Sequence, residues 1–157
     1  MKKLLIAALL AASTSAFAAG EDIKGIKIGM TKAEVAALFP KGTKGMTIAG
    51  VSNMYAGSDP VEYDKDDKVE SVIFFYKNDG FREILQAVKT KYPALKCKFS
   101  EVSNRMNAKF DQVECSIGDL SLTRIVDSID DGSISLMSKE KVSKDAADRK
   151  AKQAKDI

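Results

Sequence analysis

Apolar and polar residues repeat with different periods along the chain, and the changes of period predict two helices and several strands. Residues 31–39 and 81–92 place apolar side chains at helical spacing, and a proline ends each segment, Pro40 or Pro93. Alternating or continuous apolar runs after each helix predict strands. These runs are residues 46–55, 61–64, 68–76, the hairpin 95–117, 120–129 and 133–137.

The order of these elements is helix then strands, followed by helix then strands. It is typical of an α+β fold in which two helices pack on a mainly antiparallel sheet. The segments 25–76 and 79–138 are open to interpretation as two α-β-β units that arose by duplication. We treat residues 19–138 as a single domain, which is long enough to bury a core.

The first helix has a well-defined start. Thr31 followed by Glu34 is a capping box, and Met30 with Val35 fits a hydrophobic staple. Val35, Leu38 and Phe39 form the stripe that we expect to face the core.

Both cysteines of the chain lie in the hairpin 95–117. A turn near residues 105–107 places Cys97 opposite Cys115, Lys98 opposite Glu114 and Val102 opposite Phe110, and a shift of one residue would lose all three pairs. Directly opposed strand residues are close enough for a disulfide. We predict a Cys97–Cys115 disulfide that links the two strands of this hairpin; the alternative is two free buried thiols.

A second hairpin is predicted near the C-terminal end of the domain. Asp131-Gly132 is a turn signal between the strands 120–129 and 133–137, and it would set Ile129 opposite Ile134.

The N-terminus predicts export. Residues 1–18 combine two lysines, a short apolar run and the cleavage pattern Ala16-Phe17-Ala18, as in a Sec signal peptide; the alternative is a retained membrane anchor. We expect a periplasmic protein with no integral membrane segment after cleavage. An exported chain with two cysteines also favours a disulfide.

Residues 139–157 are polar and strongly charged, with almost no apolar stripe. They predict a frayed helix or a disordered, flexible tail. Removal of the signal peptide lowers the formal net charge of the chain from +3 to +1, which argues against a nucleic-acid partner.

The chain contains no histidine, which excludes histidine-dependent catalytic triads and zinc sites. Residues 64–67 (DKDD) lack the glycine and glutamate of a calcium loop, and we expect neither a metal nor a cofactor. A carboxylate-dependent hydrolase acting on envelope glycans stays open as an alternative, although no spacing selects a catalytic pair.

Met54 and Tyr55, beside the turn 56–60, are candidates for a contact surface.

Residues 25–35 (GIKIGMTKAEV) resemble the opening of the SmpA/OmlA (BamE-like) small envelope domains, and the helix-plus-sheet pattern is similar to beta-lactamase-inhibitor-like folds. Both resemblances imply a non-catalytic domain that works by protein contact. We therefore predict an exported binding module, an envelope accessory or an enzyme inhibitor, whose partner is another envelope or periplasmic protein. A further alternative is binding of anionic envelope surfaces through the basic tail.

Overall fold

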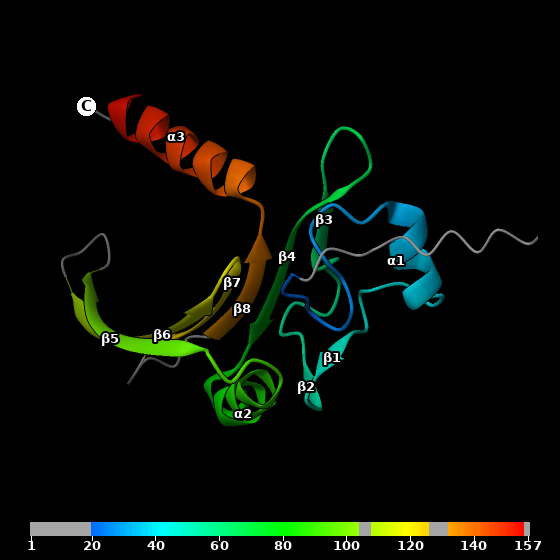
Figure 1. Ribbon diagram of the computed structural model, residues 1–157. Coiled ribbons are helices and arrows are strands. Elements are labelled where there is room, and N and C mark those ends of the chain that lie inside the picture. Colours follow the sequence, from blue (N-terminus) through cyan, green and yellow to red (C-terminus); the bar gives the residue numbers. More distant parts are fainter. Residues whose placement is uncertain (1–19, 104–107, 126–131, 156–157) are drawn as a thin grey trace, which may run out of the picture.

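The structure is a computed structural model, and it describes residues 20–103, 108–125 and 132–155. The predicted signal peptide lies outside the described residues. The fold is α+β, with a curved, antiparallel six-stranded sheet at its centre (Figure 1). The strands lie in the order β3-β4-β8-β7-β6-β5. Their bounds are β3 Val61–Tyr63, β4 Val69–Tyr76, β5 Lys96–Ser103, β6 Lys109–Ile117, β7 Leu120–Ile125 and β8 Gly132–Met137.

The cysteine hairpin forms in the predicted register. Cys97 pairs with Cys115 across β5 and β6, Lys98 with Glu114, and Val102 with Phe110. The disulfide between Cys97 and Cys115 is present. The turn that we placed at residues 105–107 lies outside the described residues.

Helix α1 (Lys32–Leu38) begins with the predicted capping box. The Thr31 hydroxyl accepts a hydrogen bond from the Glu34 backbone N–H, and the Glu34 carboxylate accepts one from the Thr31 N–H. Val35 is buried, as expected, but Leu38 is 49% exposed. The helix is two turns long and ends at Leu38, and Val35 is its one fully buried residue. Phe39, directly after the helix, is partly buried against the core, as expected.

The strand predicted over residues 46–55 is wrong. Residues 47–52 form a small separate hairpin of β1 (Thr47–Ile48) and β2 (Val51–Ser52). Ala49 and Gly50 both have positive φ values, 51° and 81°, which is the geometry of a type I′ two-residue turn. The chain therefore reverses at Gly50 where a bent but continuous strand was expected.

The predicted pairing of Ile129 with Ile134 is also wrong. Leu122 of β7 lies opposite Ile134 of β8, and Thr123 lies opposite Ser133. Gly132 is the first residue of β8 and pairs with Tyr76 of β4. The glycine is thus part of the sheet, and the other residue of the predicted turn, Asp131, lies outside the described residues.

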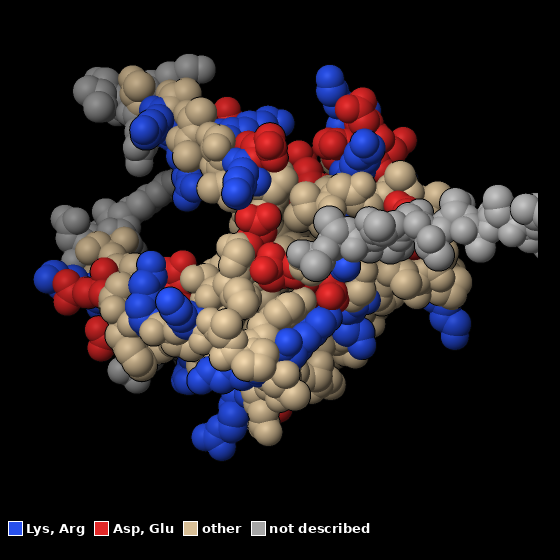
Figure 2. Space-filling model, viewed as in Figure 1, with Lys and Arg blue, Asp and Glu red and all other residues tan. Residues whose placement is uncertain are grey.

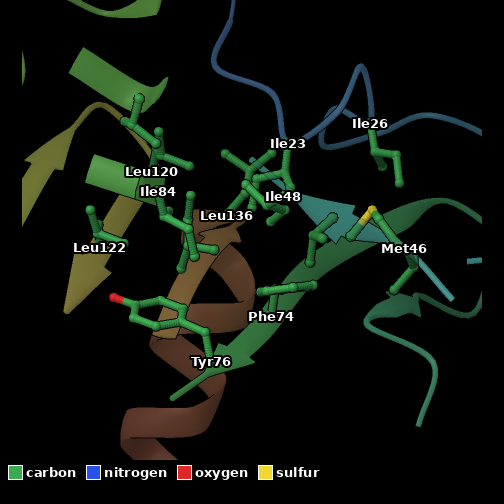
Figure 3. Close-up of a cluster of buried hydrophobic side chains, with 14 of the residues drawn as sticks. Ile23, Ile26, Met46, Ile48, Phe74, Tyr76, Ile84, Leu120, Leu122 and Leu136 are labelled. Carbon is green, nitrogen blue, oxygen red and sulfur yellow. The ribbon is translucent and has the colours of Figure 1, made fainter. Parts of the chain in front are cut away.

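Helix α2 (Phe81–Lys91) covers one face of the sheet, after a short 3₁₀ turn, η1 (Asn78–Gly80). Its buried side chains are Phe81, Ile84 and Val88, as the helical spacing predicts. Figure 3 shows Ile84 meeting apolar side chains of the sheet and of the segments that precede it. The core residues of the central strands include Val72, Phe74, Tyr76, Leu120, Leu122, Ile134 and Leu136, all at most 2% exposed.

Residues 139–155 form a continuous helix, α3. The sequence suggested a frayed helix or a disordered tail because this segment offers no apolar stripe to bury. The structure shows a different anchor near its first turn: the Lys141 ammonium group lies between carboxylates of β3 and β4.

Residues 25–76 contribute α1 and two strands of the large sheet, and residues 79–138 contribute α2 and four. The suggested duplication stays a prediction. None of the helices within the described residues is long and apolar enough to cross a membrane.

Candidate functional site

The two faces of the curved sheet differ in what covers them. Helix α2 and the segments around β1 and β2 lie on the convex side, where the apolar core is buried (Figure 1). Helix α3 leaves the end of β8 and extends over the concave side. Figure 2 shows a hollow between α3 and the part of the sheet formed by β5 and β6.

Strand register defines which side chains share this concave face. Met137 of β8 lines a cleft with residues of α3, so side chains on the face of Met137 point toward α3. Because side chains alternate along a strand, Ser133 and Ser135 share that face, and their paired residues do so too. We define the concave face as Ile73, Phe75, Ser133, Ser135, Ser121, Thr123, Glu114, Ser116, Lys96 and Lys98.

The concave face has a polar floor and two clefts at its margins. On this face, strands β7 and β8 carry Ser121, Thr123, Ser133 and Ser135. The Thr123 and Ser133 hydroxyls lie 2.8 Å apart. One cleft, of about 530 Å³, lies between Met137 and the α3 side chains Val142, Asp145, Arg149 and others. A second cleft, of about 200 Å³, is lined by Tyr55, Ile73, Phe75 and neighbouring residues.

An ion-pair cluster anchors α3 beside this face. The Lys141 Nζ lies 3.1 Å from a Glu62 carboxylate oxygen, 3.6 Å from Glu70 and 3.5 Å from Asp145. The hydroxyl of buried Ser71 donates a 2.7 Å hydrogen bond to Glu62. This hydrogen bond and the neighbouring Lys141 lower the pKa of Glu62, and Glu62 raises the pKa of Lys141. Both groups are therefore charged at neutral pH.

The other shifted carboxyl groups also favour the ionised form. Asp64 accepts hydrogen bonds from the backbone N–H groups of Lys68 and Asp66, and these lower its pKa. Burial alone would raise the pKa of Asp22, but hydrogen bonds from Lys91 and from the Gly25 N–H outweigh it, and the pKa is lowered. Each of these carboxyl groups is therefore ionised at neutral pH.

The sequence DKDD at 64–67 forms a polar hairpin turn between β3 and β4. Among the residues that the structure describes, no three acidic, cysteine or histidine side chains are placed to hold a metal ion together.

Met54 and Tyr55 lie at the margin of the concave face. The Met54 N–H donates a 2.9 Å hydrogen bond to the Phe75 carbonyl, and the Tyr55 ring meets the Phe75 ring edge-on with 5.2 Å between centroids. Tyr55 is 50% exposed and Phe75 is 37% exposed. Met54 also lines a cleft of about 520 Å³ with Lys77, Glu83 and other residues. Their role as a contact surface stays a prediction.

The two predicted features, the Tyr55 region and the Cys97–Cys115 disulfide, lie toward opposite sides of the sheet. Tyr55 lies beside β4, whereas the disulfide joins β5 to β6. Sequence reasoning missed the concave face between them. The sequence did contain a sign of this face: Leu120 and Leu122 alternate with Ser121 and Thr123. A strand with this pattern buries one face and leaves the other polar.

No family model matches this chain, and comparison with curated proteins and with solved structures finds no similar protein. The resemblance of residues 25–35 to small envelope domains therefore stays a hypothesis. Functional inference rests on the geometry of this molecule.

Proposed function

We propose that this protein is an exported, periplasmic binding module that holds a partner protein on its concave face and catalyses no reaction. The observation that carries the proposal is the unequal covering of the sheet. The convex side holds the apolar core, while the concave side presents hydroxyl groups, two clefts and a pair of exposed aromatic rings.

The shape and lining of this face suit a protein better than a small molecule. Small-molecule sites are mostly apolar and enclose their ligand, whereas this face is broad, polar and open. Protein interfaces combine a few aromatic anchors with a polar surround. Tyr55 and Phe75 supply such anchors, and Ser121, Thr123 and Ser133 supply hydrogen-bonding groups beside them.

Export is supported by residues 1–18 and by the Cys97–Cys115 disulfide. Disulfides persist in oxidising compartments such as the periplasm. The resemblance of residues 25–35 to envelope domains that work by protein contact points in the same direction.

Site-specific photo-crosslinking in intact cells tests the proposal. A photoreactive amino acid at Ser121 lies on the concave floor, and the same residue at exposed Lys89 on α2 is the matched control. We expect a dominant covalent adduct from position 121 that is absent from position 89, and a weaker yield when Tyr55→Ala is added. Equal adducts from both positions, or none from position 121, would overturn the proposal.

A second candidate function is binding of anionic envelope surfaces through α3. Helix α3 carries seven lysine and arginine residues against three acidic ones over 139–155. Basic helices are attracted to anionic headgroups in a manner that salt screens. Sedimentation with vesicles containing anionic lipid tests this candidate: binding must fall with salt and disappear when residues 139–157 are removed. Equal binding to neutral vesicles would exclude it.

A further inference from the structure

Strand β5 is a long free edge of the sheet. It pairs with β6 over eight residues, from Lys96–Ser116 to Ser103–Lys109, and it is the last strand in the sheet order. No other strand of the described residues lies along its outer side (Figure 1). The opposite edge, β3, has three residues. A free edge strand presents unpaired backbone N–H and C=O groups that can pair with another chain.

The disulfide reveals which backbone groups of β5 point outward. Cys97 and Cys115 have their Cα atoms 3.9 Å apart, which marks a closely spaced pair without mutual backbone hydrogen bonds. The N–H and C=O of Cys97 therefore point away from β6. Because the pattern alternates, those of Phe99 and Glu101 point outward too. The disulfide holds β5 against β6 and thereby fixes the position of this outward-pointing row of donors and acceptors.

The side chains of β5 differ between the two faces of the sheet. Phe99 lies on the same face as Cys97 and is 80% exposed, the most exposed of the large apolar side chains in the described residues. Lys96 and Lys98 are exposed on the other face, and Lys98 forms a 3.0 Å ion pair with Glu114. A strand added at this edge would meet an aromatic ring on one side and two ammonium groups on the other.

We infer that the β5 edge is a strand-addition site for an extended, acidic segment of a partner protein. The segment adds antiparallel to β5 as a seventh strand, its backbone bonded to Cys97, Phe99 and Glu101. Carboxylates at alternate positions face Lys96 and Lys98, and apolar side chains in between cover Phe99. Main-chain bonds supply affinity in this mode of recognition, and alternate side chains supply specificity.

The charges favour this occupant over a second copy of the chain. Two copies of β5 paired about a two-fold axis at Phe99 would place Lys98 diagonal to the Lys98 of the other copy, where like charges repel. Edge lysines oppose indiscriminate strand pairing, and an acidic segment turns the same charges into attraction. Lys96 and Lys98 also belong to the concave face, but the outward backbone groups of Cys97, Phe99 and Glu101 lie at its edge. The Glu101 variants therefore test this inference independently of the crosslink at Ser121.

Two isomeric peptides test the backbone contact. The probe is an eight-residue peptide that alternates glutamate with valine and carries a fluorophore, and fluorescence anisotropy measures its binding to the oxidised full-length mature protein. With glutamates on the lysine face, antiparallel addition directs the valine N–H groups toward β5 and the glutamate N–H groups away. We expect N-methylation of the valines to weaken binding at least tenfold, and N-methylation of the glutamates to leave it nearly unchanged.

A matched pair of variants tests the same contact from the protein side. Glu101→Pro removes an outward N–H that β6 does not use, as proline on an edge strand permits. Glu101→Ala removes the side chain and its exposed ion pair with Lys109 but keeps the N–H. We expect at least a tenfold loss of peptide affinity for the proline variant and less than a threefold change for the alanine variant, while the melting temperature shows that both fold.

The inference would be overturned by no peptide binding, by equal binding of the two methylated isomers, or by equal affinities of the two Glu101 variants. Concentration-dependent self-association that Glu101→Pro abolishes would also overturn it, by identifying a second copy as the occupant. Analytical ultracentrifugation without peptide measures that association.

Discussion

The ring of Tyr76 in β4 occupies the space beside Gly132 in β8 that a side chain at position 132 would need. The two residues are directly paired, and Tyr76 is fully buried. Its hydroxyl reaches past β8 and donates a 2.7 Å hydrogen bond to the Thr123 carbonyl in β7. Burial raises the pKa of Tyr76, so the hydroxyl remains a donor throughout the ordinary pH range. One side chain thus ties three neighbouring strands together.

Gly132→Ala should destabilise the protein because a Cβ atom at this position overlaps the Tyr76 ring. Displacement of the ring also strains its bond to Thr123. We expect a loss of about 1–3 kcal/mol in the free energy of unfolding, measured by urea denaturation. Tyr76→Phe is the control: it keeps the ring and loses the hydroxyl, at a cost of about 1–2 kcal/mol. An unchanged stability of Gly132→Ala would contradict the contact.

Cys97→Ala should lower the melting temperature markedly. The disulfide closes a loop with a sequence separation of 18 residues, and the chain-entropy estimate for such a loop is about 3 kcal/mol. Calorimetry of the oxidised protein and of the variant measures the difference. Reductant should lower the melting temperature of the parent protein and leave that of the variant unchanged. If reductant has no effect on the parent, the disulfide does not stabilise the fold.

The cysteine hairpin was predictable because its information is local. In a single antiparallel register, Cys97, Lys98 and Val102 each lie opposite a complementary residue of the next strand, so one alignment satisfies all three. The capping box of Thr31 and Glu34 was predictable for the same reason, since it joins residues three apart.

One error arises where a distant residue decides the structure. Gly132 was interpreted as a turn residue, but its lack of a side chain serves the close approach of Tyr76, more than fifty residues earlier in the sequence. Glycine in a strand often marks such an approach. The pattern of residues 46–55 hides the Ala49-Gly50 turn because strands of two residues are too short to show a period.

The concave face was partly visible in the sequence. The strand LSLTRI at 120–125 alternates apolar and polar residues, which predicts one solvated face. The position of α3 over that face was not visible. It depends on Lys141 meeting Glu62 and Glu70, two carboxylates on strands more than seventy residues earlier in the sequence.

Lys141→Met should release α3 from the sheet while the rest of the fold persists. The Lys141 side chain is 16% exposed, and its ammonium group contacts Glu62 and Glu70 of the sheet. Its loss leaves these carboxylates without their shared counter-ion. We expect amide hydrogen exchange in α3 to accelerate severalfold, with little change in β7 and β8. Lys144→Met, an exposed position on the same helix, is the control. Equal protection of α3 in both variants would contradict this role for Lys141.

The docking of α3 should depend on pH, because Glu62 and Lys141 of the same ion-pair cluster both titrate. The Ser71 hydrogen bond and Lys141 lower the pKa of Glu62 below its ordinary 4.5, so Glu62 stabilises the docked state above that pH and loses this effect as the pH falls through its lowered pKa. The pKa of Lys141 is raised above 10.5, chiefly by Glu62, so its contribution is complete below that pH and is lost as the pH rises through the raised value. We therefore expect α3 to be protected most strongly between these two limits.

Hydrogen exchange of α3, corrected for the intrinsic pH dependence of exchange and compared with β7, measures this window. Glu62→Gln is the informative variant, because it removes the titrating carboxyl and keeps the approximate shape of the side chain. In this variant the protection of α3 at neutral pH should be weaker, and its further loss in acid should be smaller than in the parent protein. A parent protein whose α3 keeps the same corrected protection from neutral pH down to about pH 2 would show that Glu62 does not anchor the helix.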